Sequence, residues 1–248
     1  MLVLQSVSKS FGGLRAIDDV SFSVPEGRIV SLIGPNGAGK TTLFALIAGF
    51  LVPDRGSIRF LDRDVTGLAP HEICRLGVAR TFQVVKPFAA QSVRENILVG
   101  AHLRRPGRRA ALTRAEEVAD LVGMTAQLDK PASSLTVAGR KRLELAKALA
   151  TEPRLLLLDE VMAGLNPTEI EGIIPVIRRL RGAGVTILLI EHVMQAVMKL
   201  SEHTWVLNQG RLIGEGAPQA IARDPAVIEA YLGHGMAARL ATVEAAHA

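Results

Sequence analysis

The feature that most constrains the fold is a glycine-rich segment, residues 34–41, which lies between an apolar run and a helical pattern. It reads Gly-Pro-Asn-Gly-Ala-Gly-Lys-Thr and follows the run Ile-Val-Ser-Leu-Ile. This fits the pattern G-x-x-x-x-G-K-[ST], in which a strand enters a phosphate-binding loop and a helix leaves it. Glycines let successive backbone N–H groups converge on an anion at a helix N-terminus. The segment therefore predicts an α/β fold with a cradle for nucleotide phosphates.

Each residue type in this cradle has its own task. Lys40 places a positive charge beside the β- and γ-phosphate oxygens, and Thr41 offers its hydroxyl to Mg²⁺. A glycine-rich turn without a ligand is the alternative, but the flanking strand and helix patterns disfavour it. The residues expected around the phosphates are Gly34, Pro35, Asn36, Gly37, Ala38, Gly39, Lys40, Thr41 and Thr42.

A second motif, Leu155 to Glu160, is an apolar strand that ends in two acids. In an open α/β sheet the carboxyl end of a strand lies at the crevice where ligands bind. Asp159 is placed to hold Mg²⁺ through water, and Glu160 to polarise an attacking water molecule. Acids also end strands simply because they are soluble, but the phosphate cradle upstream favours the functional interpretation.

Strand and helix patterns alternate along most of the chain, which has no internal repeat. Two of the predicted strands are continuous apolar runs, as is typical of central parallel strands that are covered on both faces. Helices are expected from Gly39 to about Gly49, after Pro167, and over residues 193–200. The predicted strands span residues 3–7, 21–24, 29–34, 56–61, 154–160, 185–191, 203–209 and 211–216.

Between residues 87 and 151 the strand signal disappears and helical patterns replace it. One of these helices is expected to begin at Thr113 as N-cap, with Glu116 completing a capping box. We therefore expect a helical lobe inserted at about residues 87–151 of a single domain that spans residues 1–235. The Ala-rich residues 236–248 are expected to form a frayed tail.

Composition excludes several classes of protein. The chain has 248 residues, of which 48% are hydrophobic, enough for a sizeable core. No apolar run approaches the roughly 20 residues of a membrane-spanning helix, and the first residues do not resemble a secretory signal. A single cysteine, Cys74, agrees with a reducing compartment and is expected to be a half-buried filler on a helix.

The charge of +5 does not point to nucleic acid. The basic residues are dispersed, and aromatic residues make up only 4% of the chain, too few for base-stacking platforms. The exception is the run from Arg104 to Arg109. It is expected to be a solvated loop, and an acidic partner or anionic lipid headgroups are the alternative.

With both halves of a nucleotide site present, the remaining landmarks resemble the ATP-binding subunit of an ATP-binding cassette (ABC) transporter from about Leu2 to Leu232. The resemblance implies a P-loop ATPase with a largely parallel core sheet, an antiparallel β subdomain and a helical lobe. Gln83, in "ARTFQ", corresponds to a glutamine that reaches Mg²⁺ and the attacking water. His192 corresponds to a switch histidine at the γ-phosphate, although a lone histidine is more often structural.

Two further positions belong to this resemblance. Residues 163–167 resemble the loop by which two cassettes sense each other. Phe11 falls where the family stacks a ring on adenine, but a core phenylalanine is nearly as plausible there. The resemblance implies ATP and Mg²⁺ as cofactors, with Thr41, Gln83 and Asp159 near the metal and Glu160, Gln83 and His192 in catalysis.

The segment Leu135 to Gly139 corresponds to the family's signature loop, usually Leu-Ser-Gly-Gly-Gln, which binds the γ-phosphate of ATP held by the other subunit. Thr136 retains the hydroxyl, but Ala138 replaces a glycine and Gly139 replaces the glutamine. A left-handed conformation would cost Ala138 roughly 1 kcal/mol or more. The cations at 140–142 oppose the dipole of the following helix unless an anion is present. We expect the loop to remain competent.

Several stretches, among them "DEVMAGLNPTE" and "LLIEHVM", resemble the branched-chain amino acid importer branch. This implies a second ATPase subunit of the same or a homologous chain, two transmembrane permeases, a solute-binding protein and no nucleic acid. The location implied is the cytoplasmic face of the plasma (inner) membrane. A lipid or polysaccharide export ATPase and a soluble ABC ATPase are the alternatives. A P-loop kinase or GTPase would not need Gln83, Thr136 and His192 in this order.

Overall fold

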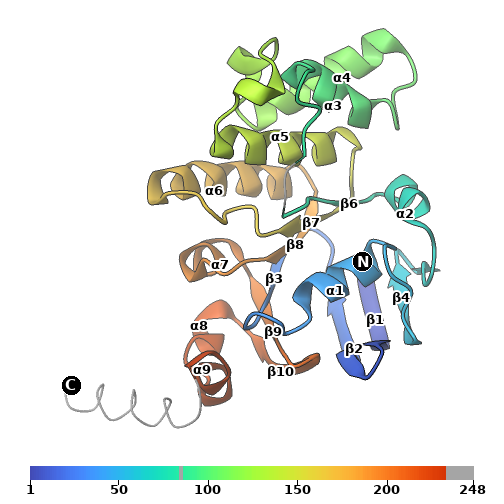
Figure 1. Ribbon diagram of the computed structural model, residues 1–248, viewed down its shortest axis with the longest axis vertical. Coiled ribbons are helices and arrows are strands. Elements are labelled where there is room, and N and C mark those ends of the chain that lie inside the picture. Colours follow the sequence, from blue (N-terminus) through green and yellow to red (C-terminus); the bar gives the residue numbers. More distant parts are fainter. Residues whose placement is uncertain (84–85, 233–248) are drawn as a thin grey trace, which may run out of the picture.

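Two β-sheets form the frame of the computed structural model, which describes residues 1–83 and 86–232 (Figure 1). The strands are β1 (Leu2–Phe11), β2 (Leu14–Val24), β3 (Ile29–Ile33), β4 (Arg55–Phe60), β5 (Arg63–Asp64), β6 (Val78–Arg80), β7 (Leu155–Asp159), β8 (Thr186–Ile190), β9 (His203–Asn208) and β10 (Arg211–Gly216). Within the described residues, a four-stranded sheet has the order β2-β1-β4-β5 and a six-stranded sheet has the order β10-β9-β3-β8-β7-β6.

The larger sheet is parallel from β9 to β6, and β10 joins its edge antiparallel to β9. Successive residues of β7 enter different apolar clusters, because neighbouring side chains of a strand point to opposite faces. Leu155 and Leu157 join the cluster that includes β1, β2, α1 and α2, whereas Leu156 and Leu158 join the cluster that includes residues of α3 to α9. The prediction of central parallel strands covered on both faces is confirmed.

Some of the helices cover the two faces of the larger sheet, and others form a separate group beyond it. They are α1 (Lys40–Ile47), α2 (Pro70–Leu76), α3 (Val93–Ala101), α4 (Arg108–Leu121), α5 (Val137–Ala150), α6 (Pro167–Gly182), α7 (Met194–Leu200), α8 (Pro218–Ile221) and α9 (Pro225–Leu232), with the short 3₁₀ helices η1 (Thr125–Gln127) and η2 (Ala132–Ser134). Helices α3, α4 and α5 pack on one another at the top of Figure 1, next to α6. Their apolar side chains join the core under α6 and α7.

The predicted start of the helix at Thr113 is wrong. Helix α4 begins at Arg108, after Gly107, and Thr113 lies inside it. There the Thr113 hydroxyl donates to the carbonyl of Arg109, one turn earlier, at 3.2 Å. Burial of Ala111 and Ala115 extends the packed face of the helix toward its N-terminal end, and this tertiary contact outweighs the local capping signal.

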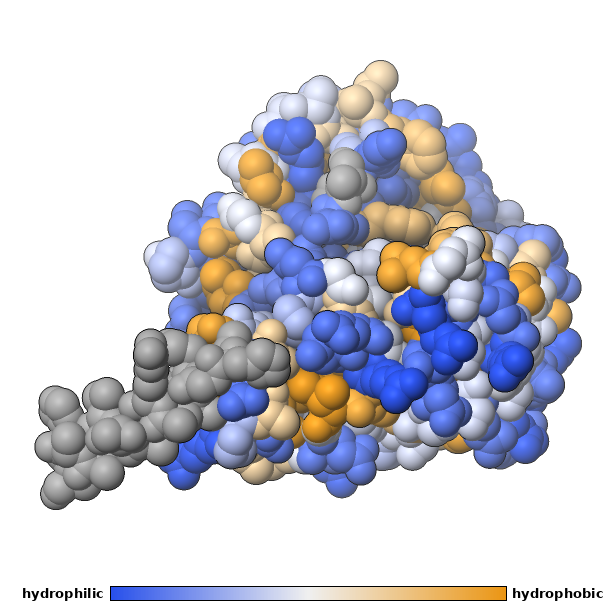
Figure 2. All heavy atoms as spheres, turned by 60° about the horizontal axis from the view of Figure 1, so that its bottom comes forward, coloured by the Kyte–Doolittle hydropathy of each residue, from blue (hydrophilic) through white to orange (hydrophobic). Residues whose placement is uncertain are grey.

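Other expectations concern the surface and the end of the chain. Trp205 is 3% exposed on β9, and Cys74 is half-buried on α2, as the sequence indicates for this cysteine. The described helices include none with the length and apolar character needed to cross a bilayer. Hydrophilic residues cover most of the face seen in Figure 2. The predicted domain end at 235 and the tail 236–248 lie outside the described residues.

Candidate nucleotide site

The phosphate cradle is the turn between β3 and α1. Gly34, Gly37 and Gly39 have φ angles of 151°, 81° and 105°, a region that favours glycine. A Cβ atom on Gly34 would lie 1.9 Å from the carbonyl oxygen of Leu207, so the loop could not approach β9 with a larger residue. The first turn of α1 contains no acidic residue and no side chain caps it. Its backbone N–H groups are therefore available to an anion.

The side chain of Lys40 folds back onto the phosphate loop that precedes it. Its ammonium donates to the carbonyl oxygens of Gly34 at 2.7 Å and Pro35 at 3.0 Å, which holds the loop in shape. Burial lowers the pKa of Lys40, while the carboxylates of Glu160 and Asp159 act in the opposite direction. The ammonium thus lies within electrostatic reach of the predicted catalytic acid, Glu160, and of the predicted metal residue, Asp159.

A hollow of about 680 Å³ extends from the loop residues 36–42. Its other lining residues include Phe11, Gln83, Glu160 and His192, so the structure brings the predicted catalytic and adenine-contacting residues to one cavity. The ring of Phe11 is 46% exposed, which excludes the interpretation of Phe11 as a core residue. An exposed ring beside a phosphate loop is available for stacking on a base.

Glu160 is the centre of the predicted catalytic cluster. Its two carboxylate oxygens contact Gln83 Nε2 at 2.5 Å and His192 Nε2 at 2.6 Å. These three residues follow β6, β7 and β8, which are neighbours in the sheet, so their side chains meet at its carboxyl edge. The φ angle of Glu160 is 49°, a left-handed conformation that costs a non-glycine residue of order 1 kcal/mol or more. Such strain persists where surrounding contacts hold the residue.

Asp159 is one of the residues predicted to lie near the metal. Its side chain is 1% exposed, and Oδ2 accepts from the Arg80 guanidinium at 2.7 Å. The other oxygen, Oδ1, is buried and has no hydrogen-bond partner among the described residues. Asp159 lines a hollow of about 540 Å³ together with Thr41 and Gln83, the other two predicted metal residues. An unpartnered carboxylate oxygen beside a hydroxyl and an amide fits a hard cation such as Mg²⁺.

The tip of α5 lies apart from this cradle and lines neither of these two hollows. Thr136 is the exposed N-cap residue of α5, and its hydroxyl oxygen accepts from the backbone N–H of Gly139 at 3.1 Å. Ala138 lies in the first turn of the helix and has no positive φ, so the cost of a left-handed alanine does not arise. The exposed helix N-terminus can receive an anion from outside the chain.

Three residues near the cluster escaped the sequence reasoning. Arg80 pairs with Asp159 and lies 5.6 to 6.0 Å from three phenylalanine rings. Lys141 is buried and donates to backbone carbonyls of the cluster, whereas the sequence indicated only a cation at a helix start. Glu191 is buried beside the predicted switch histidine, and its carboxylate accepts from the backbone N–H of Met162 at 3.0 Å. No local pattern indicates these contacts.

Burial raises the pKa of Glu191 to about 7, and the Glu160 charge acts in the same direction. The folded state therefore binds more protons than the unfolded state between about pH 4.5 and 7, so Glu191 lowers the stability of the fold as pH rises through this range. We predict that Glu191→Gln removes this contribution. Relative to the parent, the free energy of unfolding of the variant should rise by about 2 kcal/mol from pH 5.5 to 8, measured by urea denaturation. A difference that stays constant with pH would contradict the prediction.

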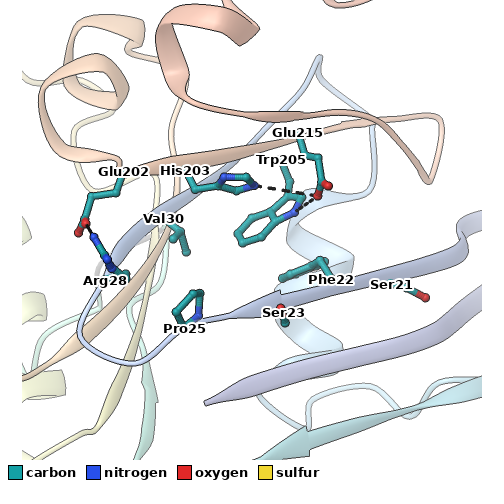
Figure 3. A pocket seen from close by; sticks show the side chains of 10 residues that line it. All are labelled: Ser21, Phe22, Ser23, Pro25, Arg28, Val30, Glu202, His203, Trp205 and Glu215. Carbon is teal, nitrogen blue, oxygen red and sulfur yellow. Dashed lines mark hydrogen bonds and ion pairs between the residues drawn. The ribbon is translucent and has the colours of Figure 1, made fainter.

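A third hollow, of about 600 Å³, has no phosphate-loop residue in its lining (Figure 3). The rings of Phe22 and His203 contact that of Trp205, with centroid separations of 4.7 and 4.6 Å. Its charged groups have partners within the chain, since Arg28 pairs with Glu202, and Trp205 Nε1 donates to Glu215 at 2.8 Å. None of the predicted site residues lines this hollow.

The fold and the site together define a P-loop nucleoside triphosphatase. Comparison with known proteins identifies the family. Residues 17–163 match the family described as ABC transporter, and residues 211–237 match the family described as branched-chain amino acid ATP-binding cassette transporter. The chain belongs to the ABC transporter family, and it is an ATPase.

Individual relatives resemble the chain over most of its length. It is 42% identical to the high-affinity branched-chain amino acid transport ATP-binding protein LivG of Salmonella typhimurium (strain LT2), over 94% of this chain and 98% of the relative. The corresponding figures for BraF of Pseudomonas aeruginosa are 40%, 94% and 98%. Among solved structures, the ADP conformation of MJ1267, an ATP-binding cassette of an ABC transporter, matches with a TM-score of 0.86 and 31% identity, covering 94% of this chain and 99% of the other.

Proposed function

We propose that this chain hydrolyses ATP to drive the import of branched-chain amino acids through a membrane permease. The observation that carries hydrolysis is the placement of Glu160, bracketed by Gln83 and His192 at the mouth of the phosphate cradle. The two relatives described above, both named for branched-chain amino acid transport, support the choice of cargo.

The proposed reaction is phosphoryl transfer to water. The N–H groups of the cradle and Lys40 neutralise the β- and γ-phosphates, and Glu160 orients the water in line with the bond that breaks. Gln83 and His192 fix the Glu160 carboxylate from two sides, so it needs little reorganisation when a proton is transferred. Thr41, Gln83 and Asp159 would hold Mg²⁺. When bound, this ion neutralises charge on the phosphate oxygens.

Each ATP is shared between two subunits in this proposal. The exposed tip of α5 carries a hydroxyl and helix N–H groups but does not line the cavity of its own chain. A second subunit, either another copy or a homologous chain, places the same tip on the γ-phosphate held here. Closing and opening the pair then drives the permease between its inward-facing and outward-facing states.

Thr136 provides a test of this shared site. Thr136→Ala should weaken ATP-driven dimerisation and lower ATP turnover about 10- to 100-fold, because a hydrogen bond to a charged group contributes about 1.5–3 kcal/mol. Thr136→Ser keeps the hydroxyl and the helix cap and should stay within about threefold of the parent. Size-exclusion chromatography with Mg²⁺ and ATP measures the dimer, and phosphate release measures turnover. An alanine variant that behaves like the serine variant would remove Thr136 from the site.

A groove between the sheet and α5 is the proposed docking surface for the permease. It has a volume of about 340 Å³, and its walls include Phe50 and Phe82, which are 51% and 44% exposed. Phe88 is also 49% exposed, which favours docking over a role in the core of the lobe. Exposed aromatic rings beside an apolar groove suit the side chains of an amphipathic helix. Val84 and Val85, which precede Phe88 in the sequence, lie outside the described residues.

The remaining partners follow from this assignment. Two permeases cross the membrane, a solute-binding protein delivers the amino acid, and this chain is peripheral on the cytoplasmic face. No nucleic acid takes part. The Arg104–Arg109 run does not join the nucleotide site, since Arg105 pairs with Glu152 and Arg104 donates to the carbonyl of Arg75.

Reconstitution tests the cargo and the direction of transport. The chain is purified with the membrane proteins that bind it and incorporated into proteoliposomes whose ATP is on the side of this chain. ATP-dependent accumulation of radiolabelled leucine, abolished by Glu160→Gln, is the expected result. Accumulation of another small polar solute, with no accumulation of leucine, would show that this solute is the cargo instead. Movement of lipid or polysaccharide in the opposite direction would replace the importer assignment with an export ATPase.

A further inference from the structure

Helix α5 connects the exposed tip to the interior of its own subunit through one side chain. Lys141 follows the tip by one turn, yet it is 8% exposed and turns into the chain. Its ammonium donates to the backbone carbonyl of Glu160 at 3.0 Å and to that of Gln83 at 3.2 Å. One buried cation from the helical lobe thus holds the backbone of two catalytic residues.

The partners of Lys141 show why this contact matters. A buried ammonium is costly unless polar groups surround it, and here the two carbonyl dipoles meet that need. The carboxyl of Glu191 lies within electrostatic reach of both Lys141 and Glu160. Because the ammonium is an obligatory donor in this setting, a shift of α5 must either carry the two carbonyls with it or break both hydrogen bonds.

The backbone segments at Glu160 and Gln83 both depend on tertiary hydrogen bonds such as those from Lys141. Glu160 has a left-handed φ of 49°. Two hydrogen bonds hold its backbone in this conformation: its N–H donates to the carbonyl of Ile190, and its carbonyl accepts from Lys141. Gln83 lies in a bend that follows β6 and belongs to no helix or strand. Strained or irregular backbone keeps its geometry only where tertiary contacts impose it. The spacing between Gln83 and the Glu160 carboxylate therefore depends on α5.

We infer that Lys141 is a positioning residue that links the two nucleotide sites of the working dimer. The tip of α5 touches the nucleotide of the partner subunit, while Lys141 on the same helix sets Gln83 and Glu160 of its own subunit. ATP in one site therefore adjusts the catalytic residues of the other. This inference rests on the shared-site dimer proposed above, and Lys141 itself touches neither nucleotide.

Simple kinetics give the first test. In the otherwise unchanged chain, Lys141→Met should lower kcat for ATP at least tenfold while KM and the affinity for a fluorescent ATP analogue stay within about twofold. Lys141→Arg keeps the charge and the donors and should recover most of the turnover. Lys130→Met removes the same charge from an exposed position of the helical lobe and should behave like the parent. Equal turnover of the Lys141→Met variant and the parent would overturn the inference.

Tandem-fused dimers separate linkage from simple structural support. One half, the reporter, keeps a working cradle. The other half carries either Glu160→Gln, which fills its cradle with ATP but does not hydrolyse it, or Lys40→Ala, which leaves its cradle empty. With Lys141 present in the reporter, turnover should be at least fivefold higher when the other cradle is filled. With Lys141→Met in the reporter, the filled and empty dimers should differ by less than twofold. The quantity to compare is the ratio of turnover in the filled dimer to turnover in the empty dimer. The change in this ratio when Lys141 is replaced is the interaction that a double-mutant cycle isolates.

The outcomes distinguish the inference from the proposal beneath it. If Lys141 were only structural, Lys141→Met would lower the turnover of the filled and the empty dimer by the same factor. The ratio would then stay unchanged, which would overturn the inference. Adding Thr136→Ala to the non-reporter half tests the shared site itself, because that tip contacts the nucleotide of the reporter. If this change left reporter turnover untouched, the shared-site dimer would fail as well. A fall in turnover together with an unchanged ratio would remove only the role of Lys141.

Discussion

Glu160→Gln should lower ATP turnover by about 10²- to 10⁴-fold, the range expected when a general base is removed. The substituted amide keeps the size of the side chain and one acceptor oxygen, so nucleotide binding should persist. ATP-bound dimers should accumulate because the step that separates them is blocked. Phosphate release measures turnover, and size-exclusion chromatography with Mg²⁺ and ATP measures the dimer.

The control for this variant is Glu116→Gln, which removes an exposed carboxylate that pairs with Arg94 in the helical lobe. Both its turnover and its dimerisation should match those of the parent. Turnover of Glu160→Gln at the parent rate would exclude Glu160 as the residue that activates water. The contacts from Gln83 and His192 would then need another explanation.

Lys40→Ala should raise the dissociation constant for ATP about 10- to 100-fold, because the charged hydrogen bonds to the phosphates are lost at about 1.5–3 kcal/mol. The variant also loses the two contacts by which Lys40 holds the carbonyls of Gly34 and Pro35. Isothermal titration calorimetry with ATP measures the affinity. Adenosine, which has no phosphates, serves as a reference ligand whose binding should change little.

Lys40→Met separates the charge from the packing of the buried stem. It keeps an unbranched apolar chain of similar length, so it should fold as stably as Lys40→Ala or better, yet bind ATP equally weakly. Recovery of parent affinity in Lys40→Met would show that packing, and not charge, explains the loss. Thermal unfolding monitored by circular dichroism verifies that both variants are folded.

Local patterns were sufficient for much of the fold. The sequences around β7 and β8 predict buried parallel strands because their side chains are apolar on both faces, and those strands are present. The glycines at 34 and 39 belong to a local pattern that predicts the phosphate loop, and their φ angles of 151° and 105° lie in the region that favours glycine. The same local reasoning failed at Thr113, where packing of α4 extended the helix past a plausible cap.

The predicted catalytic cluster shows the limit of this reasoning. Gln83, Glu160 and His192 are far apart in the sequence, and the resemblance to a family, not their spacing, suggested their common role. They meet because β6, β7 and β8 pair side by side and each residue follows the carboxyl end of its strand. The strand order depends on long-range pairing, which no local pattern encodes.

The sequence by itself determined the phosphate loop, the acidic end of β7 and the alternation of strands and helices, since each depends on neighbours within a few residues. Only the tertiary structure decided that Lys141 turns inward, that Arg80 occupies one oxygen of Asp159 and leaves the other free, and that Glu191 is buried. The physical reason is that burial and hydrogen bonding of a charged side chain depend on what the remote elements place around it.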